Sequence, residues 1–126
     1  MTADPSYALQ KAVYETITAA SVGATVYYTV PAGASLPWCV IGDDQILSDY
    51  ESGDFSECYV TVHVHGKKPA FKTIAGKVRE ALDTFIVMDD FTVVEAWFDD
   101  TKYMTESDAQ LGHAVLTFRY LVQANA

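Results

Sequence analysis

The sequence has few cysteines, few basic residues and no long apolar segment, and each shortage excludes a class of protein. Cys39 and Cys58 are the only cysteines among 126 residues, so at most one disulfide is possible, and we expect free, buried thiols instead. No apolar run approaches the ~20 residues that a membrane helix needs, which predicts no membrane partner. Eight basic against 17 acidic residues give a formal charge of −9, which disfavours sequence-specific nucleic-acid binding.

The remaining composition is typical of a folded domain. Half of the residues are hydrophobic and 13% are aromatic. Because no repeat, low-complexity tract or linker interrupts the chain, we expect a single domain over residues 1–126. The first five residues do not combine a basic region with an apolar stretch, so the sequence predicts no signal or transit peptide and a cytoplasmic origin.

The spacing of apolar residues predicts two helices. The first follows Asp4, which can cap it, and ends before Gly23; its apolar residues recur every three or four positions. The second begins near Pro69 and continues to Phe85, again with an apolar stripe. We expect both stripes to pack against a sheet.

Alternating and β-rich segments predict the strands of that sheet. They cover residues 25–30, 37–41, 58–65, 91–98 and about 110–123. The acidic segment from Asp43 to Glu57 is interpreted as a solvated loop with strand-like edges, and Asp99 with Asp100 as a turn. The prediction is an α+β fold: a mostly antiparallel sheet of about four strands, two helices on one face, and a short N-terminal β segment or hairpin.

One face of this sheet is expected to stay open. Between Cys58 and His65 the valines alternate with polar and aromatic residues, so the valines face the core and the others face outward. The mixed outer surface is typical of a protein contact. Its predicted members are Tyr59, Thr61, His63, Glu95, Trp97, Val115, Thr117 and Leu121.

No motif for catalysis is present. The chain lacks a Gly-x-Ser-x-Gly elbow and a glycine-rich phosphate loop, and its cysteines lie in apolar, strand-like contexts. We therefore predict no enzyme, no catalytic residue, no cofactor and no metal. The weaker alternative is a small-ligand or metal-binding α+β domain, because His63 and His65 project from one face and His113 can supply a third ligand.

The charges are segregated along the chain. Five of the eight basic residues lie on or just before the second helix, whereas acidic residues concentrate at 43–57 and 89–108. An ordinary solvated helix face is the simpler interpretation. The sharper one is a head-to-tail interface, in which the basic helix of one subunit meets the acidic segment of the next and forms a ring. Its predicted residues are Lys68, Lys72, Lys77, Arg79, Asp43, Asp44, Asp49 and Glu51.

Several local strings and their order resemble a known family. They are the segments 9–14 (LQKAVY), 26–27 (VY) followed by 30–31 (VP), 36–42 (LPWCVIG), 60–64 (VTVHV), 74–82 (IAGKVREAL) and 116–120 (LTFRY). Together they are similar to the tail completion, or tail terminator, proteins of long-tailed, siphovirus-like bacteriophages, prophages and gene transfer agents. The segment His65-Gly66-Lys67 departs from the family pattern, which often has an aromatic residue after this strand.

The resemblance implies a structural virion protein. Such a protein forms a ring, a hexamer, at the head-proximal end of the tail tube, ends tube polymerisation and provides the head-docking surface. Its implied partners are copies of itself, the tail tube protein and the head completion or connector proteins, and it is assembled in the bacterial host cytoplasm. The acidic excess then predicts a channel through which DNA passes without specific binding. The nearest alternative is a head completion or neck connector protein.

Overall fold

The computed structural model describes residues 4–48 and 54–125, which form two helices and five strands. The elements follow one another along the chain as α1 (Ser6–Ala20), β1 (Thr25–Tyr27), β2 (Trp38–Ser48), β3 (Phe55–Lys67), α2 (Ala70–Leu82), β4 (Phe91–Thr105) and β5 (Leu111–Ala124). No helix in the described ranges is long and apolar enough to cross a membrane.

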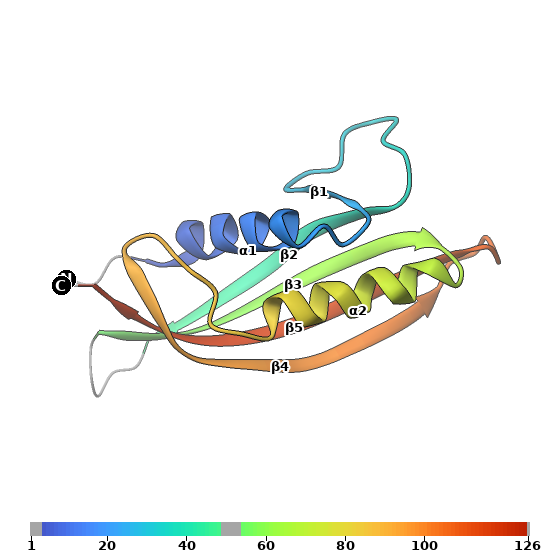
Figure 1. The fold of residues 1–126 in the computed structure, drawn as a ribbon. Coiled ribbons are helices and arrows are strands. Elements are labelled where there is room, and N and C mark those ends of the chain that lie inside the picture. The colour runs from blue at the N-terminus through green and yellow to red at the C-terminus, as the bar shows by residue number, and fades with distance from the viewer. Residues whose placement is uncertain (1–3, 49–53, 126) are drawn as a thin grey trace.

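The strands form one mixed sheet in the order β1-β2-β3-β5-β4. All neighbours pair antiparallel except β1, which pairs parallel to the start of β2. The predicted α+β class is confirmed. The expected N-terminal β segment is β1, which raises the number of strands in the sheet from about four to five. Both helices lie on the same side of the long, twisted strands (Figure 1). Helix α1 contacts β1 and β2, and α2 contacts β3, β5 and β4.

Two segments that the sequence indicated as irregular are strand. β2 continues through Asp43 and Asp44 to Ser48, and β4 continues through Asp99 and Asp100 to Thr105. In both strands the pairing register shifts, between Ile41 and Asp44 and between Phe98 and Asp100. A β-bulge adds an unpaired residue, so it breaks the alternation of inward and outward side chains that identifies a strand in sequence. The predicted loop and turn were therefore wrong at these positions.

The core lies between the helices and the inner face of the sheet. Helix α1 buries Leu9, Val13 and Ile17, and α2 buries a stripe that includes Phe71 and Val78. The buried residues of β3 and β5 alternate with half-buried ones along both strands. The buried hydrophobic residues form one continuous cluster, so a single core holds both helices on the sheet.

The helix ends differ slightly from the prediction. The N-cap residue of α1 is Pro5, which makes no side-chain capping bond, so the expected cap by Asp4 was wrong. The Asp4 carboxylate instead accepts a 2.8 Å hydrogen bond from the backbone N–H of Ser6, the first residue of the helix. Helix α2 ends at Leu82, and Phe85 beyond it is 63% exposed instead of belonging to the apolar stripe.

Candidate functional site

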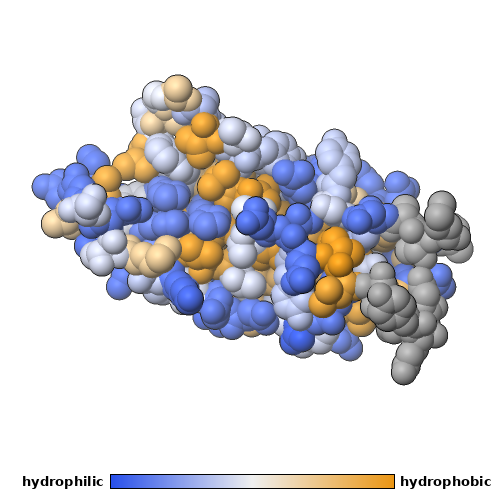
Figure 2. Space-filling model, turned by 180° about the vertical axis from the view of Figure 1, so that it is seen from behind, coloured by the Kyte–Doolittle hydropathy of each residue, from blue (hydrophilic) through white to orange (hydrophobic). Residues whose placement is uncertain are grey.

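The outer face of the sheet consists of cross-strand rows. In one row Gln45 of β2 pairs with Tyr59 of β3, which pairs with Arg119 of β5, which pairs with Trp97 of β4. The next rows are Thr61, Thr117 and Asp100; Val40, His63, Val115 and Lys102; and Trp38, His65, His113 and Met104. The predicted open-face residues on β3, β4 and β5 therefore do share one surface. Seen from behind the view of Figure 1, hydrophobic side chains lie among hydrophilic ones (Figure 2).

Arg119 is the centre of one cluster on this face. Its guanidinium carbon lies 4.2 Å from the centre of the Trp97 ring, and Nη1 lies 3.3 Å from Glu57 Oε1. The same Glu57 oxygen accepts a 2.6 Å hydrogen bond from the Tyr59 hydroxyl. This bond raises the pKa of Tyr59, so the phenol stays protonated and keeps donating. Arg119 Nε has no hydrogen-bond partner among the described residues and lies 4.0 Å from an oxygen of Asp99.

Three histidines form a second cluster toward one end of the face. His63 Nδ1 and His113 Nε2 are 2.8 Å apart, and the rings of His65 and His113 stack with centres 4.0 Å apart. Glu106 Oε1 lies 3.8 Å from Nδ1 of both His65 and His113. Partial burial lowers the pKa of all three imidazoles below its ordinary value of 6.5. The cluster is therefore neutral near pH 7, despite its carboxylate neighbour.

The residues of the predicted subunit interface occupy two separate regions. Lys72, Lys77 and Arg79 are exposed on α2, and Lys68 is exposed just before it. Two of them cover aromatic rings of their own subunit. Lys72 Nζ lies 5.2 Å from the centre of the Tyr103 ring, and the guanidinium carbon of Arg79 lies 4.1 Å from the centre of the Phe98 ring.

The acidic residues of the predicted interface lie on a different strand, away from α2. Asp43 and Asp44 are exposed on β2, where Asp44 accepts a 2.5 Å hydrogen bond from the Ser6 hydroxyl. Asp49 and Glu51 lie outside the described residues. Because α2 packs on β3, β5 and β4, the basic and acidic groups occupy opposite halves of one subunit.

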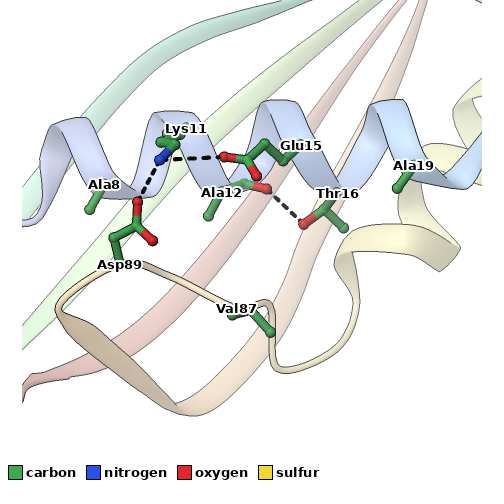
Figure 3. Close-up of a pocket in the computed structure, with 8 residues that line it drawn as sticks. All are labelled: Ala8, Lys11, Ala12, Glu15, Thr16, Ala19, Val87 and Asp89. Atoms are coloured by element: carbon green, nitrogen blue, oxygen red, sulfur yellow. Dashed lines mark hydrogen bonds and ion pairs between the residues drawn. The ribbon is translucent and has the colours of Figure 1, made fainter.

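A groove on the helical side is less suited to a ligand. It has a volume of about 420 Å³ and lies between α1 and the segment that precedes β4. Figure 3 shows small side chains of α1 facing Val87, with Lys11 between Asp89 and Glu15. Lys11 Nζ lies 2.6 Å from Asp89 and 3.8 Å from Glu15, so the charged groups of this groove pair with each other. That pairing leaves few charged groups in the groove available to orient a bound molecule.

The chain matches a protein family over nearly its whole length. The family model described as "Tail completion protein gp17" matches residues 9–123. The chain belongs to this family of tail completion proteins. Membership makes the protein a structural component of a phage-type virion tail, as the sequence resemblance predicted.

The fold is also shared with a solved virion component. One chain of a structure described as the virion of a native gene transfer agent particle aligns with a TM-score of 0.79 and 24% sequence identity. The alignment covers 94% of this chain and 97% of the other. At this identity the likeness establishes the common fold. Among curated proteins, none is detectably similar in sequence.

The sequence pattern did not single out every residue that forms the clusters of this tail completion protein. Arg119 was not among the residues singled out, because its contacts with Trp97 and Glu57 depend on strand register. Glu106 follows the end of β4 and has no periodic signal; only the return of the chain into β5 places it beside His113. Strand register, once known, identifies Arg119, whereas Glu106 is identified only by the path of the chain between β4 and β5.

Proposed function

We propose that this tail completion protein forms a hexameric ring at the head-proximal end of the tail tube. There it ends tube polymerisation and provides the surface on which the head docks. The protein acts through contact geometry and not through catalysis, and residues 1–126 act as one domain. Family membership over residues 9–123 is the observation that carries the proposal.

The distribution of charge supports a head-to-tail ring. A heterologous contact needs two different, complementary surfaces on each subunit, and a closed ring results when the rotation between subunits closes. The α2 cations and the β2 carboxylates are such a pair, on opposite halves of the sheet. We infer that Lys68, Lys72, Lys77 and Arg79 of one subunit face the acidic segment of the next, which contains Asp43, Asp44, Asp49 and Glu51.

The outer face of the sheet supports contacts with other virion proteins. Tryptophan, tyrosine and arginine are the side chains that most often dominate interface energetics. Trp97, Tyr59 and Arg119 lie in one cross-strand row, each held by its neighbours. We infer that this face, including Thr61, His63, Glu95 and Thr117, meets the tail tube or the head connector proteins.

The net charge supports a passive DNA channel. With a formal charge of −9 per chain, a ring of six copies repels a phosphate backbone wherever the acidic excess lines the opening. We infer that DNA passes through the ring without specific binding. An assembled ring with a basic lumen contradicts this inference.

Electron microscopy of particles assembled without this protein tests the proposal. A terminator predicts overlong tails without heads, because nothing stops the tube from growing. Tails of normal length beside filled, tailless heads identify a neck connector instead and overturn the terminator assignment. Restoring the protein from a plasmid is the control, and it should return normal, headed tails.

A further inference from the structure

The histidine cluster, formed by His63, His65 and His113, has the composition of a metal site. One nitrogen from each ring lies within 4.8 Å of the other two. The Glu106 carboxylate adds an oxygen at 3.8 Å from two of the rings. Three imidazoles and a carboxylate thus converge from β3, β5 and the segment between β4 and β5.

The backbone explains why these rings meet. His65 pairs directly with His113 across the β3–β5 ladder, and His63 lies two residues along the same face of β3. His63 therefore reaches His113 diagonally, at 2.8 Å between ring nitrogens. The convergence follows from the pairing register and not from a mobile segment.

Gly42 makes room for one of the rings. It lies at the β2 bulge, next to Thr61 and His63. A Cβ atom at this position would lie 2.5 Å from Thr61 Oγ1 and 2.8 Å from two atoms of the His63 ring. Because the glycine has no side chain, the His63 ring lies against the β2 backbone with its Nδ1 directed to the cluster. Any larger residue at position 42 displaces this ring.

We propose that the histidine cluster binds one divalent transition-metal ion of the Zn²⁺ type, with three imidazole ligands and a fourth position open to water. His113 presents Nε2 to His63 and Nδ1 to Glu106, so the Glu106 carboxylate orients the rings from outside, as an acceptor for their second nitrogens. Neutral imidazole nitrogens suit zinc, nickel and copper, whereas magnesium and calcium take oxygen ligands. Metal binding at this cluster does not depend on the proposed role in the virion being correct, although His63 also belongs to the outer face.

Binding requires only local rearrangement. Zinc–nitrogen bonds of about 2.0–2.1 Å in a tetrahedral site place ligand nitrogens about 3.4 Å apart. The 2.8 Å contact between His63 Nδ1 and His113 Nε2 must therefore open slightly. The rings of His65 and His113 are stacked at 18°, so at least one turns about its soft χ2 torsion to direct a nitrogen at the ion.

The occupied site links three parts of the fold. It joins β3, β5 and the segment that carries Glu106, at the end of the sheet where the Trp38 ring lies tilted beside the His65 ring, with ring centres 5.7 Å apart. An ion that binds the folded state and not the unfolded chain raises stability according to its concentration and affinity. Zinc is therefore expected to raise the melting temperature.

Titration of the full-length, EDTA-treated protein with Zn²⁺ tests the proposal. Calorimetry should show one ion per chain, and Co²⁺ should give the visible absorption of a tetrahedral nitrogen and oxygen site. His113→Ala and His65→Gln should each weaken Zn²⁺ binding about 100-fold, and Glu106→Gln about tenfold. Circular dichroism confirms that each variant is folded.

Two further variants distinguish a specific metal site from non-specific metal binding at surface histidines. Gly42→Ala keeps every ligand but displaces His63, so it should also weaken binding at least tenfold. Glu57→Gln removes a carboxylate from the Arg119 cluster on the same face and should leave the affinity unchanged. Absence of stoichiometric Zn²⁺ binding, or equal binding by the wild type and His113→Ala, overturns the proposal.

Discussion

The hydroxyl of Tyr120 donates a 2.5 Å hydrogen bond to the backbone carbonyl oxygen of Leu82. Both residues are completely buried, and Leu82 is the last residue of α2. The final carbonyl groups of a helix have no partner inside the helix, so this bond satisfies one of them where water has no access. Burial also raises the pKa of Tyr120, which keeps its proton on the hydroxyl. The bond fixes the end of α2 to β5.

Tyr120→Phe should therefore destabilise the protein. The change leaves a buried carbonyl without a donor, which costs about 1–3 kcal/mol in the free energy of unfolding. Urea unfolding followed by circular dichroism measures the loss. Tyr103→Phe is the matched control, because Tyr103 is 49% exposed, and it should shift stability by less than about 0.5 kcal/mol. Equal effects of the two variants contradict the role given to the buried bond.

Gly112→Ala should destabilise the fold by overpacking. An added Cβ at Gly112 on β5 would overlap the ring of Phe71, a buried residue of α2. Overpacking of this kind costs about 1–3 kcal/mol. Gly76→Ala on α2 is the control, since nothing lies within 4 Å of its added Cβ, and it should stabilise the helix by up to about 1 kcal/mol. Thermal unfolding should show a lower melting temperature for Gly112→Ala and a higher one for Gly76→Ala than for the wild type.

Cys39 and Cys58 should resist thiol reagents in the folded protein. Both are free and completely buried, as expected from the sequence, and burial raises the pKa of each thiol from 9.0 to about 12. The reactive thiolate is therefore scarce and inaccessible. Labelling with a chromogenic disulfide at mildly alkaline pH should be slow until denaturant is added. Fast, stoichiometric labelling of the native protein contradicts this prediction.

The same thiols should make stability fall at alkaline pH. Above about pH 9 the unfolded chain loses thiol protons that the folded protein keeps, so the free energy of unfolding decreases as pH rises toward 12. Each thiol contributes a slope of about 1.4 kcal/mol per pH unit. Cys58→Ala should reduce the slope by one such contribution, as measured by urea unfolding at several alkaline pH values.

Reversing the charges of α2 should dissociate the proposed ring. Lys72→Glu with Arg79→Glu places like charges opposite the acidic segment, so native mass spectrometry should show a shift toward monomer. Asp43→Lys with Asp44→Lys should do the same from the other side. Combining all four changes in one chain restores complementarity and should restore the ring. If every variant keeps the wild-type mass, the head-to-tail interface is wrong.

Trp97→Ala should weaken attachment to the virion more than it weakens the fold. Trp97 supports Arg119 on the outer face of the sheet, where truncation of an interface anchor costs about 2 kcal/mol or more. Binding of the purified protein to tail tubes assembled without it should fall about 30-fold or more. Tyr28→Ala is the control, because Tyr28 stacks on Tyr14 on the helical side, and it should bind tubes normally. Equal loss in both variants contradicts an outer-face contact.

Sequence patterns predicted the parts of the fold in which apolar residues recur at a regular spacing. The apolar stripes identified both helices, and the alternating valines of β3 identified its buried face, because periodicity directly reports which side faces the core. The patterns failed at Asp43 and Asp44 and at Asp99 and Asp100, where charged residues coincide with bulges. A local pattern cannot reveal an extra residue in a strand whose partner lies far away in sequence.

For the candidate sites too, the sequence determines some features and only the tertiary structure determines others. The sequence by itself determined that the chain is an acidic α+β protein without a catalytic motif, and that its histidines, with Tyr59 and Trp97, face outward from a sheet. Only the tertiary structure decided which of them touch. His63 and His113 are 50 residues apart in the chain, and their 2.8 Å contact depends on strand register, a bulge and the absence of a side chain at Gly42. Distances between strands are fixed by pairing and packing of the whole sheet, which no local pattern contains.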